Sequence, residues 1–402
     1  MNDPKRKLAT NPGGQLAPNE IFGRDEHIEK YWGILDGRSI YMNDLRRIGK
    51  TQIMVKMKAE PMSGWHPVKR DLGGLHSAAE FATRAYLDAA EVLGTKERTF
   101  RGVKSLLGKM AGAEVAGVLK LPGGEIAPWK EVLFRTFADI EDAMTTLSSE
   151  TARVERMVFL WDEVPFLLEN IAKRDGSQVA MEVLDALRAF GQDHDHVRLL
   201  LTGSIGLYHI LAELRGEKYN NSPLNRMEQV QPGPLGEGDG SQLAKALLQG
   251  TGLKCDQPDQ CAKLLANRVG HVAFFIHNLV SRLPLDGPLT EEVIERSLNR
   301  ELVDDENDDW DFAHYRTRLR RYYGPRESLA LTVLDEAATG APVDFDSLRG
   351  VVAAKHSDAE DDEQLRELLK LLCRDHYLVR TESGYRFYLE LIRRWWCIDR
   401  SL

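Results

Sequence analysis

The chain has 402 residues, enough for two or three domains, because a single hydrophobic core usually stops growing well below this length. Hydrophobic residues make up 43% and charged residues 29%, which predicts a soluble globular protein and excludes a disordered or fibrous one. The formal net charge of -9 argues against a protein that coats nucleic acid nonspecifically, since such binding depends on neutralising phosphates.

The N-terminal segment does not have the pattern of a secretory signal. Residues 1–20 are polar and predict an arm that leads into the fold. They lack the continuous apolar core of a secretory signal, and nowhere does an apolar run approach the roughly 20 residues that cross a bilayer. We therefore expect a cytoplasmic protein that does not contact a membrane.

Residues 21–238 alternate strands with helices and predict the core domain. Residues 26–35 place their apolar side chains on one helical face, a short strand follows at 39–42, and a helix begins near Lys50. Further strands are predicted at residues 68–71, 157–161 and 197–202 and around Val230. This alternation predicts an α/β fold, with a mostly parallel sheet covered by helices on both faces.

The pattern loosens between about residues 91 and 147, which we interpret as an insertion in the core. It holds a run of lysines and arginines over residues 96–109, a small-residue run, and a helix from Trp129 onward. The basic run is expected to be a solvated loop; contact with a partner in an assembled ring is the alternative.

The remaining chain is predicted to be largely helical. Residues 239–303 read as helices throughout, including a buried one at 272–280, and are interpreted as a small helical lid. An acidic break begins the last domain, 304–402, whose helices end in two short strands at 377–380 and 385–388. Helices followed by such a hairpin predict a winged helix.

The motif with the clearest chemistry is Asp44-Leu-Arg-Arg-Ile-Gly49-Lys50-Thr51. It fits the phosphate-binding pattern GxxxxGK[ST] at every defined position except the first, where Asp44 replaces glycine. In this device backbone N–H groups cradle phosphates, the lysine reaches the β and γ phosphates, and the threonine hydroxyl holds magnesium. A surface turn before an amphipathic helix is the alternative, but the flanking strand and helix favour the phosphate loop. The nucleotide contacts predicted here are Arg47, Ile48, Gly49, Lys50, Thr51 and Gln52.

Two acids follow the apolar strand 157–161. A carboxylate at the end of such a strand can orient magnesium through water, and its neighbour can activate the attacking water. We assign the first role to Asp162 and the second to Glu163. The predicted catalytic set is therefore Lys50, Asp162 and Glu163, and the predicted magnesium ligands are Thr51 and Asp162. An ordinary solvated strand end is the alternative.

The next strand, 197–202, ends in small hydroxyl residues. In a nucleotide-binding sheet the tip of the adjacent strand lies near the γ-phosphate, where Thr202 or Ser204 could sense it by hydrogen bonding. A turn supported by these hydroxyls is the alternative.

Four cysteines, Cys255, Cys261, Cys373 and Cys397, show neither CxxC spacing nor histidines at metal-binding intervals. This spacing supports neither a zinc site nor a disulfide framework. We predict reduced, structural thiols.

Several segments together resemble a known group. They are NPGGQL near the start, FGRD (22–25), RRIGKT (46–51), FLWDE (159–163), LLTGSIGL (200–207) and FYLELIRRWW (387–396). With them the chain resembles the bacterial and archaeal ATPases of the STAND/origin-recognition-like AAA branch. The resemblance implies a P-loop ATPase core with a five-stranded parallel sheet, a helical lid and a C-terminal winged helix. A missing first glycine is common in that group, so Asp44 need not indicate a dead site.

The resemblance also implies further site residues. The segment before the first strand closes over the adenine in these ATPases, which points to Phe22, Gly23 and Arg24. The chain departs from the family at Val272, which stands where the lid usually has proline. A neighbouring subunit often supplies an arginine for hydrolysis. The candidates are Arg198, Arg215 and Arg226, each of which is otherwise expected to be a solvated surface charge.

Partners are predicted from the C-terminal part. Residues 314–326 hold five arginines among three tyrosines, which could contact phosphates and stack on bases. Alternatively they form one helix whose tyrosines pack inward while its arginines meet the preceding acidic run. Trp395 and Trp396 are expected in the hydrophobic core of the last domain.

The sequence thus predicts a regulatory ATPase, using ATP and Mg²⁺, that acts as a switch or loader. A nucleotide-dependent homo-oligomer, duplex DNA and a protein partner are the assemblies considered. The alternatives are a DNA-binding module or a protein-interaction scaffold in which nucleotide is a structural ligand.

Overall fold

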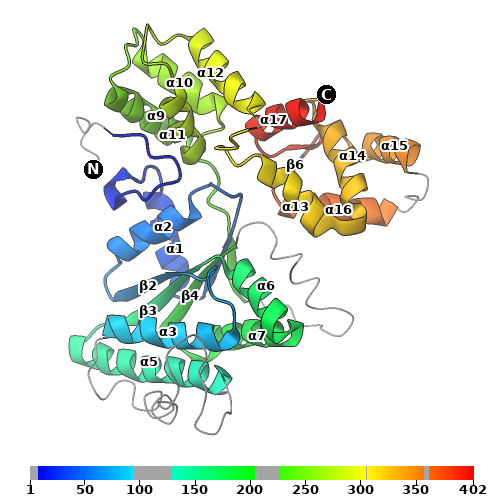
Figure 1. Cartoon of the computed structure of the whole chain (residues 1–402). Helices are drawn as coiled ribbons and strands as arrows, with labels where there is room; N and C mark the ends of the chain where they lie inside the picture. Colours follow the sequence, from blue (N-terminus) through cyan, green and yellow to red (C-terminus); the bar gives the residue numbers. More distant parts are fainter. Residues whose placement is uncertain (1–7, 94–128, 204–209, 211–225, 305, 357–361) are drawn as a thin grey trace. The chain divides into compact units, whose positions relative to one another are not determined.

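The computed structural model describes residues 8–93, 129–203, 210, 226–304, 306–356 and 362–402 (Figure 1). The chain divides into two compact units. The sheet unit contains Asp25–Asn43 and Lys50–Pro232, and the helical unit contains the residues up to Arg24, Asp44–Gly49 and Gly233–Leu402. The domain boundaries expected at 238/239 and 303/304 stay predictions.

The sheet unit is built on five parallel strands in the order β2-β3-β4-β1-β5. The strands are β1 (Ile40–Asn43), β2 (Trp65–Asp71), β3 (Arg156–Asp162), β4 (Val197–Gly203) and β5 (Glu228–Val230). The helices are α1 (Asp25–Leu35), α2 (Lys50–Ala59), α3 (Ala78–Leu93), α5 (Trp129–Thr151), α6 (Val164–Asp175) and α7 (Ser177–Asp193). The predicted α/β fold with a five-stranded parallel sheet is confirmed.

Strand periodicity explains how both faces of the sheet are covered. On β3, Val158 and Leu160 pack with the buried side chains of α1 and α2. The alternate residues Met157, Phe159 and Trp161 face the opposite way, into a larger cluster with α3, α5, α6 and α7. Successive side chains of a strand point to opposite faces, so a strand buried on both sides reads as one continuous apolar run. Figure 1 shows α1 and α2 on one face of the sheet and α3 and α5 on the other.

Most of helix α5 lies within the stretch interpreted from sequence as an insertion, yet the helix belongs to the core. Phe137 is fully buried, stacks on Phe190 with ring centroids 3.8 Å apart, and contacts Phe159 of β3. The basic run at 96–109 lies outside the described residues.

The helical unit contains the predicted lid and C-terminal segments. Its elements are η1 (Pro18–Glu20), α9 (Glu237–Thr251), α10 (Pro258–Arg268), α11 (Ala273–Arg282), α12 (Glu291–Val303), α13 (Ala313–Tyr323), η2 (Gly324–Arg326), α14 (Glu327–Ala337), α15 (Phe345–Lys355), α16 (Asp362–Arg374), β6 (Leu378–Thr381), β7 (Gly384–Phe387) and α17 (Glu390–Arg400). The predicted buried helix is α11, and the predicted hairpin is the antiparallel pair β6–β7. Val343, just before α15, adds an isolated antiparallel bridge to Tyr385 of β7.

Trp395 and Trp396 are core residues, as expected. Trp395 stacks on Phe312, and Trp396 is fully buried with its indole N–H donating to Asp335 Oδ1 at 3.0 Å. In the parts of the chain that the structure describes, no helix has the length and apolar character to traverse a bilayer.

Candidate functional site

The candidate site lies at the carboxyl edge of the sheet, where α2 begins beside the end of β3. The Thr51 hydroxyl donates to Asp162 Oδ2 at 2.6 Å, across 111 residues of sequence. Asp162 is the last residue of β3, and Thr51 is the second residue of α2. The structure therefore brings together the two predicted magnesium ligands.

A second threonine fixes the other oxygen of the same carboxylate. Thr202 is fully buried on β4 and donates its hydroxyl to Asp162 Oδ1. The Glu163 N–H donates to the same oxygen at 3.1 Å. Asp162 is itself buried, and an ionised carboxylate held by several donors is oriented as well as stabilised.

The position of Thr202 follows from the strand order. β4 lies between β1, which leads into the phosphate-loop motif, and β3, which ends in the acids. Parallel strands end at the same edge of a sheet, so Thr202 reaches Asp162 from the adjacent strand. The other candidate at this strand end, Ser204, lies outside the described residues.

Glu163 occupies a strained turn between β3 and α6. Its backbone has φ 58° and ψ 40°, the left-handed region that non-glycine residues rarely adopt. The Glu163 N–H also approaches the Thr202 hydroxyl at 3.4 Å. A strained backbone of this kind costs on the order of 1 kcal/mol or more.

Lys50 begins α2 and is buried, with 7% of its surface exposed. Directly before it, Gly49 has φ 103°, a backbone conformation that glycine adopts without the steric cost of a side chain. The ammonium of Lys50 and the first backbone N–H groups of α2 thus belong to the N-terminus of the helix, the end that favours anions. Gln52 follows on the same first turn of α2, half-buried.

Asp44, which replaces the first glycine of the motif, has a structural role that the sequence did not reveal. It is fully buried; Oδ1 accepts from Leu45 N at 2.7 Å and Oδ2 accepts from Gly233 N at 2.7 Å. The carboxylate therefore ties the start of the loop to Gly233 within the helical unit.

The predicted adenine segment also contacts the loop. Arg24 is buried, and its Nη2 donates hydrogen bonds to Ile48 O and Gly233 O, each at 2.8 Å. Gly23 has φ 59°, and an added Cβ would lie 2.6 Å from the Asp239 side chain, so a larger residue does not fit there. Phe22 is half-buried beside them in the chain.

The Arg47 side chain contacts residues outside the loop. Its guanidinium lies 4.6 Å from the centroid of the Phe274 ring and 3.2 Å from Asp311 Oδ2. Arg46 pairs with the same carboxylate at 2.5 Å. Nucleotide contact by Arg47 stays a prediction.

The three candidate arginines have different outcomes. Arg198 is buried at the start of β4, where it donates to Leu35 O at 3.1 Å and to His194 O at 2.8 Å. The expectation that it is a solvated surface charge was wrong, since its partners are backbone carbonyls; burial lowers the pKa of its guanidinium. Arg226 is exposed, and Arg215 lies outside the described residues.

The basic stretch at 314–326 forms α13 and η2. Tyr315 and Tyr323 are buried, as is Arg318, so the interpretation of a helix with inward-facing tyrosines is supported. Arg316 pairs with Asp399 at 3.5 Å, whereas the acidic run pairs with arginines from elsewhere, including Arg282.

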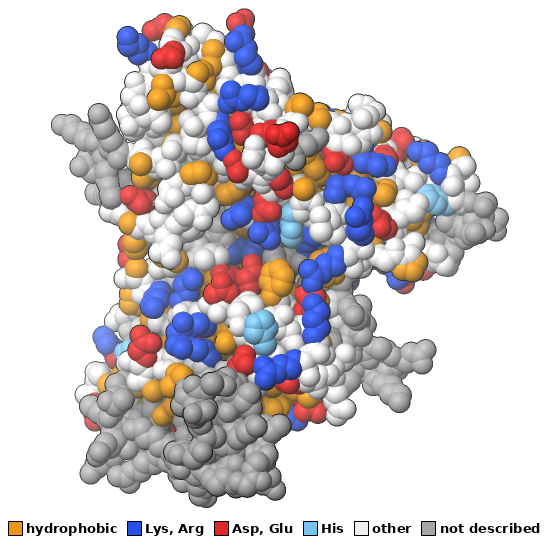
Figure 2. Space-filling model, viewed as in Figure 1, with side chains coloured by type: hydrophobic (Ala, Val, Ile, Leu, Met, Phe, Trp, Pro, Cys, Tyr) orange, Lys and Arg blue, Asp and Glu red, His pale blue; other side chains and the backbone are white. Residues whose placement is uncertain are grey.

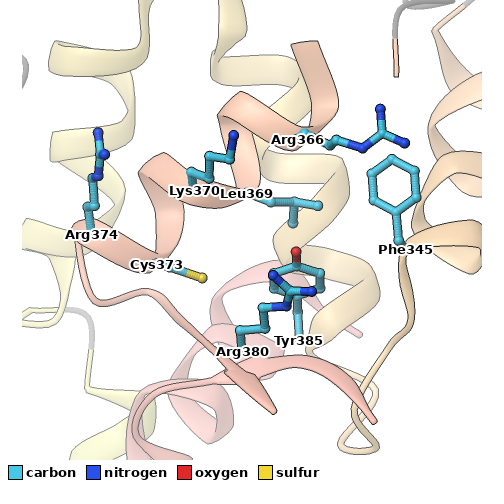
Figure 3. Close-up of a pocket in the computed structure, with 8 residues that line it drawn as sticks. All are labelled: Phe345, Arg366, Leu369, Lys370, Cys373, Arg374, Arg380 and Tyr385. Atoms are coloured by element: carbon cyan, nitrogen blue, oxygen red, sulfur yellow. The ribbon is translucent and has the colours of Figure 1, made fainter. Parts of the chain in front are cut away.

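A second group of basic side chains lies exposed on α16 and the β6–β7 hairpin. Arg366, Lys370 and Arg374 are all exposed and follow each other at four-residue spacing, which places them along one face of the helix. With Arg380 of β6 they line a pocket of about 440 Å³ (Figure 3). The rest of its lining is Phe345, Leu369, Cys373 and Tyr385. The four-residue spacing was readable in the sequence, but only the fold brings Arg380 beside it.

On one face of the molecule, charges of both signs are mixed. On the face drawn in Figure 2, Lys and Arg side chains lie among Asp and Glu and do not form one continuous basic surface. This distribution agrees with the net charge of -9.

Comparisons with known proteins identify the fold. The chain matches no protein-family model and no curated protein. Among solved structures it is similar to a Walker-type ATPase of Pyrococcus abyssi, with a TM-score of 0.61, 17% identity, and coverage of 94% of this chain and 96% of that one. Weaker similarities are to the Aeropyrum pernix ORC2 protein (TM-score 0.47, 11% identity, 94% and 95% coverage) and to the Thermotoga maritima RuvB Holliday junction branch migration motor (0.37, 13%, 90% and 91%). The first similarity shows that the chain has the fold of a P-loop ATPase.

Proposed function

We propose that this protein binds ATP with Mg²⁺ at the start of α2, hydrolyses it slowly, and uses the bound nucleotide as a switch. The observation that carries the proposal is the 2.6 Å contact between Thr51 Oγ1 and Asp162 Oδ2. It joins the hydroxyl of a GKT motif to an acid at the end of a buried strand, in a sheet whose fold is that of a Walker-type ATPase.

The donor set fits magnesium. Mg²⁺ prefers oxygen ligands and is usually held by one or two protein groups, with water and phosphate oxygens completing the octahedron. Thr51 and Asp162 are such a pair, and in the described residues no group of three or more His, Cys, Asp or Glu is arranged as an all-protein metal cage. When bound, magnesium would neutralise charge on the β and γ phosphates.

The chain's own residues supply the remaining chemistry. Lys50 and the first N–H groups of α2 bind phosphate oxygens. Glu163, at the same sheet edge, accepts a proton from the attacking water. Thr202 acts as a positioning residue, because its hydroxyl holds Asp162 Oδ1 while Thr51 holds Oδ2.

The switch role is supported by where the chain passes from one compact unit to the other. The chain passes between the units at four points, and one of these, between Gly49 and Lys50, lies inside the phosphate-loop motif. A nucleotide that binds one arrangement more tightly shifts the equilibrium toward it by that difference in affinity. We propose that this shift drives assembly or partner binding, as in a regulatory ATPase of the STAND/origin-recognition-like branch.

The test is Mg²⁺-ATP binding and phosphate release by the full chain and two variants with matched controls. Lys50→Ala is expected to weaken nucleotide binding at least 10-fold, whereas Lys58→Ala, at the exposed end of the same helix, leaves it unchanged. Glu163→Gln is expected to lower turnover about 100-fold while binding persists, and Glu60→Gln is its surface control. Equal phosphate release by wild type and Glu163→Gln rejects hydrolysis, and failure of the wild type to take up nucleotide rejects the whole proposal.

A second candidate function is duplex DNA binding by the C-terminal helices. We propose that α14, α15, α16 and the β6–β7 hairpin form a winged helix, whose basic face is the pocket-lining set Arg366, Lys370, Arg374 and Arg380. In Figure 3, Arg380 and Tyr385 come from the hairpin and the three other basic residues come from α16. Exposed cations along one helix face are suited to phosphate contacts.

Charge reversal separates this candidate from a protein-interaction scaffold. Lys370→Glu is expected to weaken DNA binding and to reduce the slope of log affinity against log salt by at least about 1. The matched control is Lys263→Glu, an exposed lysine of α10. Equal affinities for wild type and Lys370→Glu would remove DNA binding from this surface and favour the scaffold.

A further inference from the structure

Two of the four thiols lie in direct contact. Cys255, in the loop between α9 and α10, has its Sγ 2.8 Å from the Sγ of Cys261, the fourth residue of α10. A disulfide bond is about 2.0 Å long, so the two sulfurs need to approach by less than 1 Å to bond. The six-residue separation gave no such indication, because only the turn into α10 folds the loop back on the helix.

The backbone on both sides of Cys255 is anchored. Lys254 O accepts from Leu289 N at 2.9 Å, which holds the loop against the segment before α12. Gln257 O accepts from Cys261 N at 3.0 Å, which starts α10. The contact between the sulfurs therefore belongs to a defined turn.

A metal site does not explain the pair. Structural zinc takes four protein ligands, and in the described part of the chain no cluster of three or more His, Cys, Asp or Glu surrounds these thiols. Cys397 has a different kind of neighbour, since its thiol lies 3.4 Å from Ala338 O.

We propose that Cys255 and Cys261 are a redox modification site, which forms a reversible intrachain disulfide with a small disulfide oxidant such as oxidised glutathione. The thiolate of Cys255 attacks one sulfur of the oxidant, which breaks its S–S bond and releases one glutathione thiolate. Cys261 then gives up its thiol proton to the released glutathione thiolate, and its sulfur attacks the Cys255 sulfur and releases the second glutathione. Two electrons pass to the oxidant, and the two thiol protons end on the two glutathione molecules.

The order of attack follows from exposure. Cys255 is half-exposed, whereas Cys261 is buried and burial raises its pKa to about 12. The oxidant therefore meets Cys255 first, and Cys261 acts as the resolving thiol because its sulfur already lies in contact.

The chain offers a direct readout. Trypsin cleaves after Lys254 and Lys263, so both cysteines lie in one peptide, residues 255–263. The full folded chain is treated with oxidised glutathione, alkylated and digested. We expect peptide 255–263 to have lost two hydrogens and to carry no alkyl group, and reduction before alkylation to restore two alkyl groups. Cys373 and Cys397 are internal controls, which we expect to remain open to alkylation or to carry glutathione.

Three further measurements test the pair. The disulfide is expected to form at least 10-fold faster in the folded chain than in the urea-unfolded chain, and Cys255→Ser is expected to leave Cys261 alkylatable after oxidation. The oxidised protein is also expected to melt a few degrees higher, because the bond restrains the unfolded loop. Two alkyl groups on peptide 255–263 after oxidation, or equal rates in the folded and unfolded chains, would overturn the proposal.

Discussion

Replacing Asp44 with the glycine of the phosphate-loop pattern is expected to lower the stability of the protein. In Asp44→Gly the buried carboxylate is lost, and with it the acceptors for Leu45 N and Gly233 N, each at 2.7 Å. A hydrogen bond to a charged group contributes about 1.5–3 kcal/mol, and a buried N–H left without an acceptor costs about 1–3 kcal/mol. The hydrogen bond to Leu45 N joins adjacent residues and contributes less to stability. The variant also avoids the desolvation cost of burying a carboxylate, which offsets part of the lost stability. We expect a net loss of about 2–3 kcal/mol.

The local readout is hydrogen exchange at the Gly233 amide, followed by mass spectrometry or NMR. Because 1.36 kcal/mol corresponds to a factor of ten, protection of this amide is expected to fall roughly 30- to 150-fold. Asp44→Asn keeps one acceptor oxygen and is expected to lose less. The matched control is Asp71→Gly at the end of β2, where an exposed carboxylate accepts one N–H, from Gly73, and the loss is expected to stay below about 1 kcal/mol. Unchanged protection at Gly233 in Asp44→Gly would refute the assigned role of the carboxylate.

Three further predictions follow from buried contacts. Thr202→Val is expected to lower ATP turnover about 10-fold with little change in nucleotide affinity, because Asp162 loses an orienting hydroxyl. Thr202→Ser keeps the hydroxyl and is expected to retain the wild-type rate. A Thr202→Val variant as fast as wild type would contradict the positioning role. Phe137→Ala is expected to cost about 3–5 kcal/mol in urea unfolding of the sheet unit, and a cost below about 1 kcal/mol would place α5 outside the core. His277 is buried and accepts from Asn11 N, and burial lowers its pKa to about 4. Between about pH 6.5 and 4 the unfolded chain binds a proton at this histidine that the folded chain does not, so the free energy of unfolding falls by on the order of 3 kcal/mol as the pH drops through this range. His277→Leu is expected to reduce this dependence of the unfolding free energy on pH. An unchanged dependence in the variant rejects the assignment.

The local elements could be predicted from the sequence because their signals are local. Four apolar residues on one face of residues 26–35 are the buried residues of α1, and the apolar runs at 157–161 and 197–202 are the buried strands β3 and β4. A Gly-Lys-Thr triplet between a strand and a helix indicates a phosphate loop for the same reason, since spacing along one short segment determines which N–H groups and side chains point together.

Tertiary structure decided everything that depends on strand order and on distant contacts. β4 lies between β1 and β3, so Thr202 reaches Asp162, and Asp44 finds Gly233 across 189 residues. No periodicity reports which strands are neighbours. Arg198 shows the same limit, because an arginine is expected at the surface until the fold supplies carbonyls that satisfy its guanidinium. Local pattern thus determined the elements and the loop, whereas the packing of distant segments, which buries polar groups only where partners meet them, determined the site.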